Sequence, residues 1–325
     1  MFAKNTELNL FDIILQFIER TTKRAVSPCV FIAMGKLIRC ISTDGTLTIM
    51  AADTTDIVNE AANIHQTSAV VSAALGRLLT ATSLMGSALK GKDNSVTVKI
   101  NGGGPAGTVL AVSDFQGNVR GYVQQNVVEI PLNKKGKLDV SGAVGTDGFV
   151  TVIKDLGLKE PYIGQTPIIT GEIAEDITAY FATSEQTPSV VALGVLVNPD
   201  LSIKAAGGFI IQLLPTAMED TIEKVERCIK SVEPVTKLIE RGMTPEEICH
   251  YVLPEFEIEE LDSANPVYKC YCSRSKVESA LISTGLAELN DMATQEKTEV
   301  GCQFCNANYV FTPDDIKRLI KRATK

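Results

Sequence analysis

The chain has 325 residues, of which 45% are hydrophobic and 22% charged, a balance typical of a globular protein that folds without disulfide bonds. Its formal net charge of -8 argues against a general nucleic-acid binder, because a negative surface repels phosphate backbones. The unbroken apolar runs, such as residues 29–34, are far shorter than the roughly 18 residues that cross a bilayer, so we expect no membrane-spanning segment.

The first 33 residues differ from the rest of the chain. Apolar residues are crowded between Leu8 and Ile18, but Glu7, Asp12 and Glu19 do not fit an organellar transit peptide. A secretory leader with a cleavable small-residue end is not recognisable either, so we expect a cytoplasmic protein. We interpret residues 1–33 as an extension outside the fold.

An α+β domain is predicted over residues 34–215. Short β-prone runs at 37–42 and 46–51 flank Asp44-Gly45, a dipeptide favoured in tight hairpin turns. Apolar residues then recur at three- and four-residue spacing up to Leu89, which predicts two packed helices. A helix is also expected over residues 174–182. Further strands are predicted over residues 95–100, 108–113, 119–124, 149–154, 168–172, 190–197 and 201–211. The first three of them are expected to form an antiparallel meander.

Residues 216–265 hold the excess negative charge, with 5 basic against 13 acidic residues. Their pattern is helical, and Thr244-Pro245-Glu246-Glu247 is a capping box with proline at the first helical position. Few apolar residues lie between the acidic ones, so we expect an acidic linker of low local stability.

Four of the eight cysteines form two tight pairs near the C-terminus, Cys270-x-Cys272 and Cys302-x-x-Cys305. Four thiolates are the closed tetrahedral donor set that Zn²⁺ prefers, and a CxxC turn between two β runs is a common zinc-binding knuckle. The aromatic neighbours Tyr271 and Phe304 are predicted to pack over the metal. Residues 266–325 are therefore predicted to form a small zinc domain.

The predicted zinc site is either structural or a switch. Two thiolates separated by one residue close a small, strained ring on oxidation. Zinc contributes roughly 10 to 16 kcal/mol to the folding of small metal-binding peptides, so loss of the metal would unfold the module. A hydrolytic or cysteine-protease catalytic set is improbable, because His65 and His250 are the only histidines, and we expect His65 at the surface or as a helix cap.

Several long motifs accompany the cysteine pairs. With them the chain closely resembles the Hsp33 family of redox-regulated 33 kDa chaperonins from Met34 to the C-terminal helix. The stretches that carry the resemblance are residues 39–41, 51–55, 74–81, 98–105, 144–148 and 205–215, together with Cys270, Cys272, Cys302 and Cys305.

The resemblance implies a holdase chaperone that is inactive when reduced and bound to one Zn²⁺. It implies that oxidants convert the ligands into disulfides Cys270–Cys272 and Cys302–Cys305, that zinc leaves, and that the linker unfolds. The oxidised protein would form a homodimer and bind unfolding client proteins. The apolar linker residues that would then be exposed to clients are Ile222, Val225, Ile229 and Val232.

Two other classes of protein remain as alternatives. A zinc-ribbon nucleic-acid module needs basic residues near the knuckles, but residues 266–325 carry only 9 basic against 7 acidic residues. A thiol-disulfide oxidoreductase needs a CxxC at a helix N-terminus, whereas both pairs are expected among strands and loops.

Overall fold

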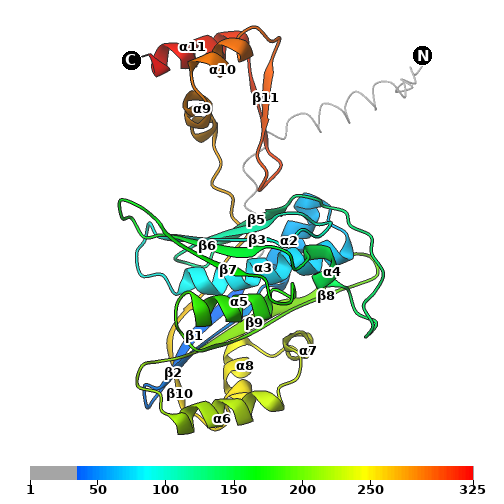
Figure 1. Ribbon diagram of the computed structural model, residues 1–325, viewed down its shortest axis with the longest axis vertical. Helices are drawn as coiled ribbons and strands as arrows, with labels where there is room; N and C mark the ends of the chain where they lie inside the picture. Colours follow the sequence, from blue (N-terminus) through cyan, green and yellow to red (C-terminus); the bar gives the residue numbers. More distant parts are fainter. Residues whose placement is uncertain (1–34, 325) are drawn as a thin grey trace, which may run out of the picture. The chain divides into compact units, whose positions relative to one another are not determined.

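The computed structural model describes residues 35–324, which contain two five-stranded antiparallel sheets, several helices and a small C-terminal module (Figure 1). The predicted α+β fold class is confirmed. The predicted extension, residues 1–33, lies outside the described residues.

The first sheet has the strand order β10-β1-β2-β9-β8. The predicted hairpin joins β1 to β2, and Gly45 adopts a φ of +67° in its turn, a left-handed conformation that glycine tolerates without strain. The strands of this sheet are β1 (Lys36–Ser42), β2 (Leu47–Asp53), β8 (Ser189–Val197), β9 (Ile203–Leu213) and β10 (Ile258–Ala264).

The second sheet has the order β5-β4-β3-β6-β7 and contains the predicted meander. Alternate residues of each strand are buried, so one face of the sheet packs on the core and the other faces outward. Its strands are β3 (Ser95–Asn101), β4 (Val109–Asp114), β5 (Val119–Val123), β6 (Phe149–Asp155) and β7 (Tyr162–Pro167).

Helix α3 (Ala69–Ser87) contacts both sheets and is buried on nearly every side. Two of its buried hydroxyls are satisfied within the helix, since Thr80 and Thr82 donate to the carbonyls four residues earlier at 2.9 and 2.7 Å. Within residues 35–324 it is the one helix long and apolar enough to cross a membrane, and most of it is buried in the core. The neighbouring helices are α2 (Thr55–His65) and α4 (Val140–Val144).

The predicted strand over residues 168–172 is wrong. These residues form a tight turn that precedes α5 (Ala174–Thr183), and the strand lies earlier, at β7. The fully buried Asp176 carboxylate holds the turn, because it accepts the backbone N–H groups of Ile169, Thr170, Gly171 and Ile173 at 2.8 to 3.3 Å. A side chain thus supplies the backbone partners that a sheet would have supplied.

Replacing this carboxylate is expected to destabilise the core. Asp176→Ala should lower the free energy of unfolding by about 2 to 4 kcal/mol, because buried N–H groups lose a charged acceptor. Urea denaturation of the reduced protein measures the change. The exposed neighbour provides the control, since Glu175→Ala should change stability by no more than about 0.5 kcal/mol. Equal denaturation midpoints for the two variants would contradict this role of Asp176.

The acidic region contains three helices that pack on the first sheet, α6 (Glu219–Lys230), α7 (Val235–Glu240) and α8 (Pro245–Val252). The predicted capping box of Thr244 and Glu247 is present, at 3.2 and 2.8 Å. The apolar faces of the helices close a second core with sheet residues such as Phe209, so this region is better buried than the sequence suggested. Residues 258–264 are a strand, β10, paired with β1, and not part of a helical segment.

The C-terminal module has its own small core of five buried side chains. It consists of α9 (Arg274–Ser283), α10 (Leu286–Met292), the hairpin of β11 (Thr298–Gly301) and β12 (Asn308–Phe311), and α11 (Pro313–Ala323). Its buried core residues are Leu281, Leu289, Phe311, Ile316 and Leu319.

Candidate metal centre

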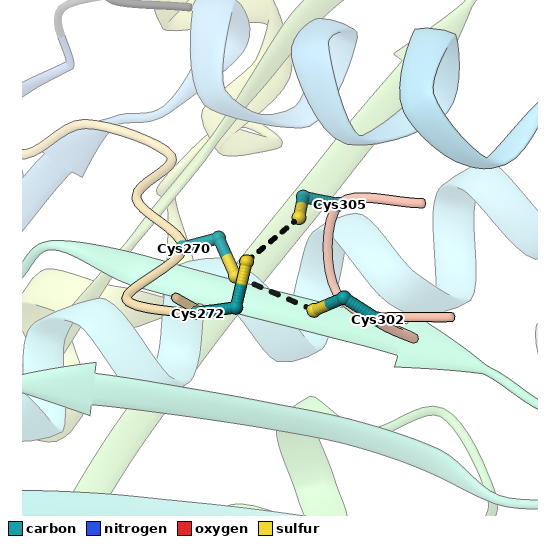
Figure 2. A group of neighbouring side chains, drawn as sticks. All are labelled: Cys270, Cys272, Cys302 and Cys305. Carbon is teal, nitrogen blue, oxygen red and sulfur yellow. Dashed lines mark hydrogen bonds between the residues drawn. The ribbon is translucent and has the colours of Figure 1, made fainter. Parts of the chain in front are cut away.

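The four paired cysteines converge on one point. Cys270 and Cys272 precede α9, whereas Cys302 and Cys305 lie in the turn between β11 and β12. All four sulfur atoms lie within 4.8 Å of one another (Figure 2). Two of the contacts join the pairs, with Cys270 and Cys302 Sγ atoms 3.6 Å apart and those of Cys272 and Cys305 3.4 Å apart.

The backbone of the hairpin turn holds Cys302 and Cys305 on the same side. Cys302 N donates to Ala307 O and Asn306 N donates to Cys302 O, both at 2.9 Å. Asn306 adopts a φ of +57°, a left-handed conformation that asparagine tolerates better than most residues. The predicted zinc knuckle is therefore folded as a tight turn between two short strands.

The sulfur cluster fits a divalent metal ion with tetrahedral geometry. Zn–S bonds of about 2.3 Å place neighbouring sulfur atoms about 3.8 Å apart, close to the spacing of the two contacts between the pairs. The donors are all sulfur and half-buried, the set that structural zinc sites use. These four residues can hold the ion.

The environment acts differently on Cys270, Cys272 and Cys305. Burial raises the pKa of Cys270 to about 11 and also raises the pKa of Cys305. Burial acts in the same direction on Cys272, but hydrogen bonds from Tyr309, at 3.1 Å, and from neighbouring sulfurs lower its pKa. A bound cation would favour the thiolate form of all four, because it compensates their negative charge.

The aromatic neighbours of the ligands line a pocket together with Cys270, Cys272 and Cys302 and also contact the second sheet. Phe304 packs edge-on against Tyr122 of β5, with ring centroids 5.5 Å apart. The Arg120 guanidinium lies 5.2 Å from the ring centroid of Tyr271 and 5.0 Å from that of Phe304. The rings therefore attach the cluster to β5.

His65 is buried, so its predicted surface position is wrong. Its Nε2 lies 2.9 Å from Gly121 O and 3.2 Å from the Tyr268 hydroxyl, and burial lowers its pKa. The hydroxyl of Tyr268 in turn donates to Phe304 O at 2.5 Å. Sequence reasoning missed both residues, because nothing in the local pattern links the end of α2 to a segment about 200 residues later.

The predicted client-binding residues occupy different environments. Val225 is buried in the second core, Ile229 and Val232 pack partly against it, and Ile222 is 42% exposed. The remaining thiols of the described chain, Cys40, Cys228 and Cys249, are buried away from the cluster.

Two antiparallel sheets around a central helix, joined to a small module with four converging thiols, define an α+β protein with a cysteine metal centre. The family model described as Hsp33 protein matches residues 35–312. The chain belongs to the Hsp33 family of 33 kDa chaperonins, which are holdases and not enzymes. The predicted family is thus confirmed.

Individual relatives agree with the family. The 33 kDa chaperonin of Clostridium beijerinckii is 49% identical over 289 residues, which cover 89% of this chain and 99% of the relative. That of Bacillus pumilus is 48% identical over 293 residues, which cover 90% of this chain and 100% of the relative. The crystal structure of the Thermotoga maritima 33 kDa chaperonin superposes with a TM-score of 0.80 at 37% identity, over 89% of this chain and 98% of that one.

Proposed function

We propose that this chain is a redox-regulated holdase of the cytoplasm, in which Cys270, Cys272, Cys302 and Cys305 bind one Zn²⁺ in the reduced, inactive state. The observation that carries the proposal is the convergence of four thiols at the base of a module with only five buried core residues. Three buried unpaired thiols elsewhere are typical of a reducing compartment.

The stability of the module depends on the sulfur cluster. A core of five side chains is small for about 55 residues, and domains of this size commonly need a metal or disulfides to fold. When bound, zinc joins the start of the module to its β11–β12 hairpin and contributes roughly 10 to 16 kcal/mol. Loss of the thiolate ligands therefore removes the largest single contribution to folding.

Oxidation removes the ligands in pairs. Two thiolates give up two electrons and form one S–S bond, and hydrogen peroxide accepts the electrons and two protons and is reduced to water. We propose the pairs Cys270–Cys272 and Cys302–Cys305.

The alternative pairing would oppose the switch. The sulfurs that touch across the cluster belong to residues 32 and 33 positions apart. Disulfides between them would close long loops and stabilise the module by about 3 to 4 kcal/mol each. Local disulfides close very small rings and leave the module free to unfold, which favours the local pairing.

Unfolding of the C-terminal module would also destabilise the acidic region next to it. Only residues 265–269 separate the end of β10 from the first ligand, and the outward residues of β10 include Glu259, Glu260 and Asp262. Asp262 pairs with Arg39 at 3.1 Å, but Glu259 and Glu260 have no ion-pair partner among the described residues, and their repulsion lowers the local stability of this edge strand. Its release, with that of α6, would expose the apolar residues that we propose bind clients, Ile222, Val225, Ile229 and Val232.

The two alternative functions have less support. In α11, Lys317 and Arg318 pair with Asp314 and Asp315, and Arg322 pairs with Glu278, so three of its four basic residues are neutralised by acidic neighbours and little free phosphate-binding surface is left. The CxxC lies in a hairpin turn and not at a helix N-terminus, the position that activates oxidoreductase thiols.

Peroxide treatment of the full chain tests the proposal. A chromogenic chelator should detect one equivalent of zinc released, light scattering should show that only the oxidised protein suppresses aggregation of a heat-labile client, and gel filtration should show a dimer. Peptide mapping without reductant should find Cys270 joined to Cys272 and Cys302 to Cys305. Activity of the reduced, zinc-loaded protein equal to that of the oxidised protein would contradict the proposal.

A further inference from the structure

The outer edge of β5 is covered by four residues that lead to the metal centre, Pro266–Lys269, which we call the capping segment. Its backbone pairs with β5 in the parallel direction, since Val119 N donates to Val267 O at 3.0 Å and Lys269 N donates to Val119 O at 2.9 Å. Such an edge otherwise presents unpaired N–H and C=O groups to any extended chain.

The capping segment fills this edge incompletely. Beyond Val119 the next outward-facing backbone groups belong to Gly121, and the side chain of Tyr268 meets them instead of a second backbone. The Tyr268 hydroxyl lies 3.4 Å from Gly121 N and 2.9 Å from Gly121 O. Gly121 O also lies 2.9 Å from Nε2 of His65 in α2, so the group that lacks a close partner is Gly121 N, which has only the long contact to Tyr268.

The metal centre keeps the capping segment in place. The hydroxyl of Tyr268 also donates to Phe304 O in the knuckle, and the Asn306 side chain donates to Ile64 O of α2 at 2.6 Å. These contacts depend on the folded turn that carries Cys302 and Cys305. Loss of that turn frees both the knuckle and the four residues that cover β5.

Two partly apolar side chains lie beside the edge. On the outward face of the sheet, Leu110 of β4 is opposite Tyr122 of β5, and Phe304 of the knuckle covers the Tyr122 ring. A groove of about 550 Å³ adjoins them, with Gln303 and Asn306 of the knuckle in its wall. Departure of the knuckle would open this groove and uncover an aromatic anchor next to free backbone groups.

We propose that the outer edge of β5 binds an extended segment of an unfolding client by strand addition, and that the capping segment occludes this site in the reduced protein. The present occupant is itself an extended stretch of chain, which shows the type of ligand that fits. Lys99 and Arg120 on the same face favour segments without excess positive charge. The inference rests on the proposed chaperone function and adds a site outside the acidic region.

Amide hydrogen exchange of the full chain tests the site, with reduced and carboxymethylated α-lactalbumin as a permanently unfolded, acidic probe. The amides of Val119 and Gly121 should be protected in the reduced protein, exchange at least tenfold faster after oxidation, and regain protection when the probe is added. Protection that survives oxidation, or exchange that stays fast while the probe is bound, would overturn the proposal. Protection regained by dimerisation without the probe would assign the edge to a second copy of the chain instead.

A matched pair of variants tests the anchor. Tyr122→Ala on β5 should weaken probe binding by the oxidised protein roughly tenfold, the usual effect of removing an interface tyrosine. Tyr162→Ala on β7, at the opposite edge of the same sheet, should leave binding unchanged. Equal affinities would refute the β5 site while leaving the proposed chaperone function intact. No probe binding by oxidised wild type would refute both.

Discussion

The double variant Cys302→Ser/Cys305→Ser should suppress client aggregation without any oxidant. Two of the four ligands are removed, so the module loses most of the roughly 10 to 16 kcal/mol that zinc contributes, and a core of five residues cannot replace it. We expect partial constitutive activity in a light-scattering assay, together with loss of bound zinc. The missing disulfides should not matter, because unfolding and not the S–S bond exposes the client-binding surface.

A control variant distinguishes loss of the ligands from damage to the turn. Gln303 is exposed and lies between the two cysteines. Gln303→Ser should therefore keep zinc and remain inactive until oxidised. A double cysteine variant as inert as the reduced wild type would count against the switch, whereas activity in Gln303→Ser would show that any change in the turn suffices.

Phe311→Ala is expected to sensitise the switch without changing a sulfur atom. Phe311 is fully buried, and the guanidinium of Arg274 lies 4.3 Å from its ring centroid. Removing a buried phenylalanine costs about 3 to 5 kcal/mol, and because zinc binding and folding are coupled, zinc affinity should fall by about two to four orders of magnitude. A chelator that wild type resists should then remove zinc and activate the variant without oxidant.

The adjacent residue of β12 supplies the control. Val310 is 44% exposed, so Val310→Ala should retain wild-type zinc affinity and resist the same chelator. Zinc competition titrations followed by the aggregation assay measure both quantities. Tight zinc binding by Phe311→Ala would show that the module does not couple its core to its metal site.

The features that the sequence predicted well are local. The Asp44-Gly45 hairpin and the capping box at Thr244 each depend on residues within a few positions of one another. The cysteine knuckle is equally local, and its partner pair follows from the chemistry of zinc. Such short-range rules fix both the elements and the candidate ligands.

The features that it missed depend on distant partners. Three of the seven residues of β10 are acidic and the strand resembles a solvated segment, so only pairing with β1 makes it a strand. The Asp176 carboxylate accepts backbone N–H groups that a strand would pair with a neighbouring strand. The hydrophobic periodicity of the sequence does not reveal such a contact. His65 meets Tyr268 only after the whole fold has formed. The proposed client-binding residues stay a prediction.

The outermost position of β10 has a consequence for recovery after stress. Detaching β10 breaks only its pairing with β1. The other four strands of the sheet stay hydrogen-bonded to one another and packed on the core. The four strands that remain keep the free edge of β1 in place. The acidic region can pair with this edge again once a reductant returns. In the first sheet the proposed transition therefore involves only the outermost strand, and the four strands that remain favour its reversal.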